Sequence, residues 1–152
     1  MKCSALLAAL TALLLAFASA TPAAATAEDL DPRLAYALEM EPGGMVIDGR
    51  TAYWPHLAMT LTLPGMEPRG LSKKCPTGLI CAFQYLDEAG PRLTWASCGT
   101  YSTTALPSVG SVASARSTGY VQARNGTTVL ATASAGNYTN VGGATNNIRC
   151  VA

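Results

Sequence analysis

Cysteine is the residue type whose number and spacing most clearly predict chemistry in this chain. One of its five cysteines, Cys3, lies in an apolar amino-terminal segment and is set aside. The other four are Cys75, Cys81, Cys98 and Cys150, and none has the C-x-x-C spacing or the histidine partner that a zinc site needs. An even number of cysteines without metal-ligand spacing predicts two disulfides, and therefore an oxidising compartment.

Four cysteines allow three pairings, of which we favour Cys75 with Cys81 and Cys98 with Cys150. The segment 75–78 reads Cys-Pro-Thr-Gly, and these turn residues let the chain fold back towards Cys81. The chain-entropy model gives about 2 kcal/mol for the shorter bridge and about 4 kcal/mol for the longer one. We therefore expect the longer bridge to contribute more to stability.

Residues suited to catalysis are few, and they form no recognised constellation. The single histidine, His56, stands between Pro55 and Leu57 without a neighbouring carboxylate or nucleophile. The chain has no G-x-S-x-G or H-E-x-x-H element. Asp87 and Glu88 are adjacent, whereas catalytic carboxylates must face each other across a substrate, so we expect a solvated loop tip. The sequence predicts no enzyme activity and no cofactor.

The amino terminus has the order of features that defines a secretion signal. A single lysine is followed by an almost unbroken apolar run over residues 5–18 and then by small residues. The run is shorter than the ~20 residues that a membrane span needs. A-x-A cleavage sites end at Ala20 and Ala27, and Pro22 favours the second because it breaks the apolar helix before it. We expect a signal peptide over 1–27 and a secreted, extracellular protein without membrane attachment.

Charge is distributed unevenly, although ten basic and nine acidic residues nearly balance. Six of the acids lie between Glu28 and Asp48, and bases predominate from Lys73 onwards. No basic run is dense enough to indicate nucleic-acid binding. The mildly basic body is suited to acidic partners, with an ordinary solvated surface as the simpler interpretation. The sequence makes no prediction of oligomeric state.

An amino-terminal extension precedes the cysteine-containing body. Residues 28–42 are acidic, and we expect this segment to be flexible, with a short helix over 33–41. Residues 43–72 predict a β-hairpin and a linker, because strand-like runs flank the Asp-Gly turn signal at 48–49. A further strand with clean alternation is expected over 59–63.

Residues 73–152 have the pattern of a separate all-β domain. Apolar and polar residues alternate over 81–85, and Asn125-Gly126 is the strongest hairpin signal in the chain. No segment after residue 73 shows helical periodicity.

An internal repeat divides this domain into two units. Leu, Ala, Ser, Gly and Tyr of residues 93–101 recur 37 positions later, over 130–138. A unit of this length holds four short strands, the size of a Greek key, and two such units can pack as one sandwich. In each copy a glycine permits a sharp bend. We expect Tyr101 and Tyr138 to bury their rings and to bond backbone through their hydroxyls, as in a tyrosine corner.

Residues 75–83 and 93–101, together with Gly90, resemble the βγ-crystallin-like secreted proteins of actinobacteria, which are grouped with the Streptomyces metalloproteinase inhibitor in peptidase inhibitor family I36. The resemblance spans 43–150 and depends on the C-x5-C-[AL]-[FY] opening and the doubled Gly-x-Tyr. It implies an all-β, βγ-crystallin-like sandwich of two Greek-key motifs, stabilised by disulfides and preceded by a β-hairpin extension. It also implies a secreted peptidase inhibitor.

The chain departs from this family at two places. Glu88 stands where the second aromatic residue of the family's hairpin is expected. The stretch 106–111 lacks the carboxylate and amide ligands of a crystallin-type calcium site, so we expect no metal.

Two loops are candidates for insertion into the cleft of an extracellular protease. One lies between Cys75 and Cys81, and the other is a hairpin tip over 86–92. The candidate residues are Thr77, Gly78, Leu79, Ile80 and Leu86. Leu79 and Ile80 offer apolar side chains, for which core packing is the alternative role. Two functional hypotheses compete with it: a non-catalytic binding or toxin-like module that acts at a cell wall or a competitor's surface, and a structural secreted protein with no enzyme target.

Overall fold

The computed structural model describes residues 30–65 and 75–152 of this 152-residue chain. These residues form one α-helix, α1 (Pro32–Met40), one short 3-10 helix, η2 (Pro55–Leu57), and eleven strands. The strands are β1 (Met45–Asp48), β2 (Thr51–Trp54), β3 (Met59–Thr62), β4 (Ile80–Phe83), β5 (Arg92–Trp95), β6 (Thr100–Ser102), β7 (Ser111–Ser114), β8 (Tyr120–Asn125), β9 (Thr128–Ser134), β10 (Asn137–Asn140) and β11 (Asn147–Val151).

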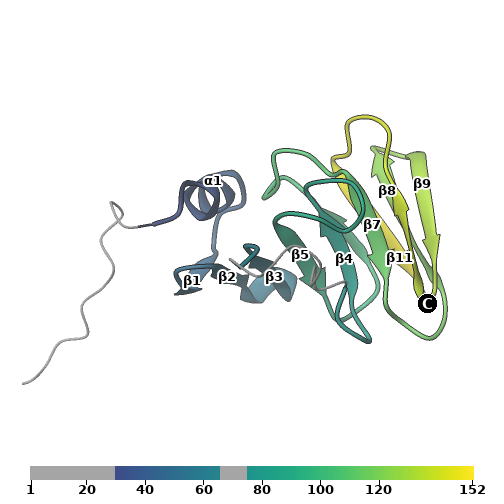
Figure 1. The fold of residues 1–152 in the computed structure, drawn as a ribbon, viewed down its shortest axis with the longest axis horizontal. Helices are drawn as coiled ribbons and strands as arrows, with labels where there is room; N and C mark the ends of the chain where they lie inside the picture. The colour runs from purple at the N-terminus through teal and green to yellow at the C-terminus, as the bar shows by residue number, and fades with distance from the viewer. Residues whose placement is uncertain (1–29, 66–74) are drawn as a thin grey trace, which may run out of the picture.

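Two antiparallel sheets contain all of these strands (Figure 1). The larger sheet has the order β1-β2-β3-β5-β4-β7-β10, and the smaller has the order β6-β11-β8-β9. Buried and more exposed side chains alternate along β8, because successive residues of a strand point to opposite faces of its sheet. Val121 and Ala123 are fully buried on the face that packs against the core, whereas their sequence neighbours are not. The expectation of a mostly β-sheet protein is confirmed.

The eight strands after residue 75 fall into two groups of four with the same arrangement. In the first group β5, β4 and β7 are neighbours, and in the second β9, β8 and β11 are neighbours. The third strand of each group, β6 or β10, is hydrogen-bonded in the sheet of the other group. The repeat at 93–101 and 130–138 falls on equivalent strands of the two groups, β5–β6 and β9–β10.

Both favoured disulfides are present, Cys75–Cys81 and Cys98–Cys150. The first closes a loop within the first group. The second joins the turn before β6 to β11, and so links the two groups covalently. Tight turns are also present at both predicted hairpins, Gly49-Arg50 directly after Asp48 between β1 and β2 and Gly126-Thr127 directly after Asn125 between β8 and β9.

The amino-terminal extension belongs to the same structure as the body, which differs from our expectation. Strand β3 pairs with β5 along its whole length, from Met59 opposite Trp95 to Thr62 opposite Arg92, so the larger sheet continues across the expected domain boundary. Helix α1 is ordered rather than flexible, because Leu34 and Ala37 are fully buried in the core shared by both sheets.

Helix α1 is capped at its amino end by Asp31, whose carboxylate accepts a hydrogen bond from the Arg33 amide at 2.9 Å. The Arg33 guanidinium also bonds this carboxylate, and it lowers the pKa of Asp31 to about 2. At the other end, the Trp54 indole donates to the Glu41 carbonyl at 2.6 Å. The helix predicted over 33–41 is thus present, as α1 (Pro32–Met40). The predicted signal peptide lies outside the described residues.

Candidate functional site

A loop over residues 84–91, here called the tip loop, connects β4 to β5 and contains one of the predicted site residues, Leu86. Its backbone closes on itself, since the Gln84 amide donates to the Pro91 carbonyl at 2.9 Å and the Tyr85 amide to the Ala89 carbonyl at 3.1 Å. Asp87 and Glu88 both adopt the left-handed conformation, with φ of 56° and 57°. The chain therefore reverses direction directly after Leu86.

Ser111, at the start of β7, holds the tip loop through its side chain. Its buried hydroxyl donates to the Tyr85 carbonyl at 2.8 Å and accepts from the Glu88 amide at 3.0 Å. One hydroxyl thus joins the residues before and after Leu86 and Asp87. Since the bond from the Glu88 amide is buried and the bond to the Tyr85 carbonyl is partly buried, loss of the Ser111 hydroxyl would take a partner from two backbone polar groups that have little access to water.

Asn140, at the end of β10, braces the loop from a second side. Its side-chain oxygen accepts from the Asp87 amide at 2.8 Å, and its side-chain nitrogen donates to the Asp87 carboxylate at 2.9 Å. Asn140 lies directly opposite Ser111 in the β7–β10 pair, so the two braces are neighbours. The conformation of the loop is therefore set by two adjacent strands of the larger sheet.

Two glycines allow this close packing. Gly90 has φ of +81°, and a side chain there would overlap the ring of Tyr85. A side chain at Gly110 would overlap the backbone of Tyr85. The tip loop is thus held by Ser111 and Asn140, while Tyr85 and Leu86 each remain 54% exposed.

Glu88 differs from the expected solvated tip residue, because it is only 6% exposed, whereas Asp87 is exposed. Its carboxylate accepts a hydrogen bond from the Cys75 amide at 3.2 Å. Burial lowers the pKa of the nearby Arg92 guanidinium, and the negative charge of Glu88 acts in the opposite direction.

The loop between Cys75 and Cys81 offers less to a partner than we expected. Thr77 and Gly78 are exposed, but Leu79 is half-buried against the cluster of Cys75, Cys81, Phe83 and Ala113. Ile80 begins β4 and is fully buried. Leu79 and Ile80 therefore have packing roles, and the one exposed apolar side chain among the predicted site residues is Leu86.

The two predicted tyrosine corners have different structures. Tyr101 is half-buried; it donates its hydroxyl proton to the Ser97 carbonyl at 3.0 Å, and its ring stacks on Trp95 with centroids 5.2 Å apart. The prediction is wrong for Tyr138, whose ring is 45% exposed. The repeat explains the difference, because Thr132 stands at the position equivalent to Trp95 and offers no aromatic surface.

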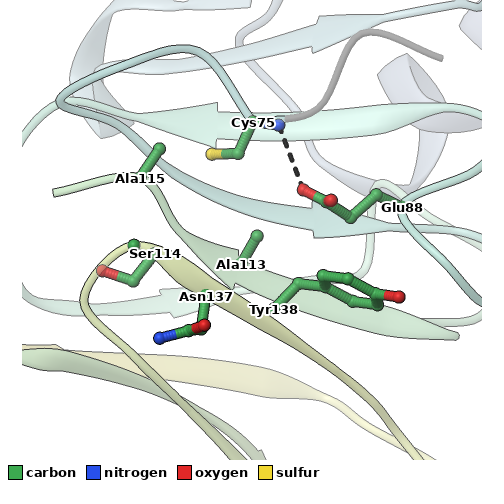
Figure 2. A pocket seen from close by; sticks show the side chains of 8 residues that line it. Cys75, Glu88, Ala113, Ser114, Ala115, Asn137 and Tyr138 are labelled. Carbon is green, nitrogen blue, oxygen red and sulfur yellow. Dashed lines mark hydrogen bonds between the residues drawn. The ribbon is translucent and has the colours of Figure 1, made fainter.

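A cavity of about 120 Å³ lies beside the tip loop (Figure 2). Its lining consists of Cys75, Glu88, Ala113, Ser114, Ala115, Gly136, Asn137 and Tyr138. Within residues 30–65 and 75–152, His, Cys, Asp and Glu form no group of three that could hold a metal ion. No helix in these same two ranges combines the length and the apolar character required to cross a membrane.

Comparison of the chain with protein-family models, with curated proteins and with solved structures finds no match in any of the three. Function is therefore inferred from the geometry of the described residues.

Proposed function

We propose that this chain is a secreted, non-catalytic inhibitor of an extracellular peptidase, and that it binds reversibly through the tip loop. The observation that carries the proposal is Leu86, an exposed apolar side chain on a loop braced by Ser111 and Asn140. A braced loop loses little conformational entropy on binding, so most of the contact energy of Leu86 and Tyr85 contributes to affinity.

The loop geometry favours occupation of a protease cleft without cleavage. An extended peptide pairs with the cleft through its backbone. Here the left-handed Asp87 and Glu88 turn the chain away after Leu86, and the Asp87 amide is already bonded to Asn140. Leu86 can enter an apolar subsite while the bond that follows it stays out of reach. Peptidases with apolar subsites, thermolysin-like metallopeptidases above all, are the expected targets.

We also propose that the body is a βγ-crystallin-like pair of Greek keys, as the sequence resemblance implies. Its support is the common strand arrangement of the two groups and the exchange of their third strands, β6 and β10. Secretion is supported by the two disulfides, which persist in oxidising compartments.

The test is a titration of thermolysin-type and subtilisin-type peptidases with the exported protein. We expect inhibition of at least one peptidase, and Leu86→Asp should weaken it by at least about 30-fold, the effect of an anchor worth about 2 kcal/mol. Val129→Asp, at an exposed apolar residue on β9, is the matched control and should inhibit like the wild type. Equal inhibition by both variants, or none by the wild type, would disprove the proposal.

A second candidate function, the binding of an anionic cell-wall or cell-surface polymer, is favoured by a separate observation. The chain has no acidic residue after Glu88, but four arginines. Arg124 and Arg149 lie on the outer face of the smaller sheet as diagonal neighbours on β8 and β11, about 7–8 Å apart. Co-sedimentation with purified cell walls separates this candidate from the first, since Arg149→Glu should abolish it and Leu86→Asp should not.

A further inference from the structure

The end of β8 and the turn after it contain the one Asn-Gly pair of this chain, Asn125 followed by Gly126. Both residues are exposed, and Gly126 has φ of +58° at the first position of the two-residue turn. Asparagine is a thermolabile residue, and a following glycine makes it more so, because glycine has no side chain to shield its amide nitrogen from the asparagine carboxamide. The turn therefore combines the reacting groups of a deamidation with access to water.

The reaction needs these two residues and water. The Gly126 amide nitrogen bonds to Cγ of Asn125, the Cγ–Nδ2 bond breaks, and ammonia leaves with the proton of the amide. The resulting succinimide then adds water. Opening at the side-chain carbonyl gives aspartate, and opening at the backbone carbonyl gives isoaspartate, whose main chain runs through Cβ and Cγ. Either product places a carboxylate directly after Arg124, and isoaspartate also lengthens the turn.

Asn146, in the segment before β11, holds both reacting groups. Its side-chain oxygen accepts a hydrogen bond from the Gly126 amide at 2.9 Å, and its side-chain nitrogen donates to the Asn125 side-chain oxygen at 3.1 Å. Asn147 donates to the same Asn146 oxygen at 2.7 Å and to the Gly126 carbonyl at 3.0 Å. Two asparagines, here called the asparagine clamp, thus hold the peptide groups on both sides of Gly126.

The asparagine clamp is itself positioned by the smaller sheet, in which β11, β8 and β9 are neighbours (Figure 1). The Asn146 backbone amide donates to the Arg124 carbonyl at 3.0 Å, and Asn147 lies directly opposite Arg124 in the β8–β11 pair. Ring closure requires the Gly126 nitrogen to leave the Asn146 oxygen and to approach Cγ of Asn125. The folded structure therefore opposes the reaction that the local sequence favours.

We propose that Asn125 is a site of spontaneous deamidation, and that Asn146 controls its rate by holding the Gly126 amide. Asn125 persists while the clamp is closed, and each opening of the clamp permits cyclisation. The new carboxylate would reduce the positive charge of the outer face of the smaller sheet, where Arg124 lies. The proposal goes beyond the inhibitory function and does not depend on it, because the tip loop belongs to the other four-strand group.

The experiment incubates the full exported protein at mildly alkaline pH and physiological temperature, and follows Asn125 by peptide mapping with mass spectrometry. The same chain unfolded in guanidinium chloride provides the rate without the clamp. We expect aspartate and isoaspartate to form at Asn125 in the unfolded sample, and at least about ten-fold more slowly in the folded one, because two hydrogen bonds must open first. Equal rates in the two samples would overturn the proposal.

Two variants assign the protection to the clamp. Asn146→Ala removes both bonds to the reacting groups and should raise the rate at Asn125 about five- to ten-fold. Asn137→Ala is the matched control, because Asn137 is an exposed asparagine whose side chain bonds Ser134 and Ala135 within its own turn. It should react at the wild-type rate. The proposal is overturned if Asn125 stays intact in Asn146→Ala, or if the two variants react equally fast.

Amide hydrogen exchange of the wild type tests the clamp without any substitution. The Gly126 amide should exchange several-fold more slowly than its sequence predicts, because its proton is held by Asn146. Thr127 is the internal control, since its amide makes no hydrogen bond within the described residues although it belongs to the same turn. Equal protection of the two amides would show that the clamp is open in solution, and would overturn the control by Asn146.

Discussion

The two four-strand groups of the body share one arrangement but differ in the loops that they carry. The first group joins β4 to β5 through the eight-residue tip loop, whereas the second joins β8 to β9 through the tight turn at Gly126-Thr127. Tyr101 of the first group is bonded and stacked, and its counterpart Tyr138 is exposed. A repeated scaffold can thus confine its binding features to one copy while the other copy supplies support. Asn140 of the second group provides this support directly, since it braces the loop of the first.

The strongest test of this interdependence is removal of the disulfide that joins the two groups. The double substitution Cys98→Ala with Cys150→Ala should cost about 4 kcal/mol, because it frees a long loop in the unfolded chain. Cys75→Ala with Cys81→Ala, within the first group alone, should cost about 2 kcal/mol. Urea unfolding followed by tryptophan fluorescence measures both. An equal or larger loss for the shorter bridge would contradict the expectation.

The second prediction concerns the buried brace of the tip loop. Ser111→Ala removes a hydroxyl that bonds both the Tyr85 carbonyl and the Glu88 amide, and it should lower the free energy of unfolding by about 2–3 kcal/mol. Ser108→Ala is the matched control, because Ser108 is exposed and makes one long hydrogen bond to the same loop. It should change stability by less than about 0.5 kcal/mol. Similar losses in the two variants would mean that burial does not determine the contribution of these hydroxyls.

The third prediction separates the two braces by their effect on function. Asn140→Ala removes two exposed hydrogen bonds to Asp87, so we expect a loss of stability of at most about 1 kcal/mol. The affinity for the target peptidase should nevertheless fall about ten-fold, because the loop then loses more entropy on binding. Inhibition constants and unfolding curves measured on the same variant test this. A variant that inhibits like the wild type would show that Ser111 alone orders the loop.

The sequence predicted the local parts of this structure better than the long-range ones. The hairpin turns and the short helix are properties of neighbouring residues, and both were found. The alternation expected over 81–85 was not, because β4 lies between β5 and β7 and all four of its residues are buried. The braces of the tip loop join residues 23 and 53 positions apart, and no local pattern identifies Ser111 or Asn140 as their source. Glu88 was misjudged for the same reason, since its burial depends on the amide of Cys75, 13 residues away.

The extension illustrates a related difficulty. Its acidic composition suggested flexibility, but Leu34 and Ala37, two residues of one helical face, are enough to fix α1 in the core. The hairpin of the extension also had a clear local signal. The pairing of β3 with β5 had none, because any edge strand with alternating apolar residues could have paired with β3. Local patterns therefore predicted the elements and left their assembly open.

The smallest expected effect compares the two repeat tyrosines directly. Tyr101→Phe removes the hydroxyl that bonds the Ser97 carbonyl while keeping the ring stacked on Trp95, so it should cost about 1 kcal/mol. Tyr138→Phe changes an exposed residue and should cost less than about 0.5 kcal/mol. Chemical unfolding of the two variants side by side resolves this difference. If Tyr138→Phe were the more costly change, the second copy would contain a buried contact of its hydroxyl, and the contrast between the two groups would no longer hold.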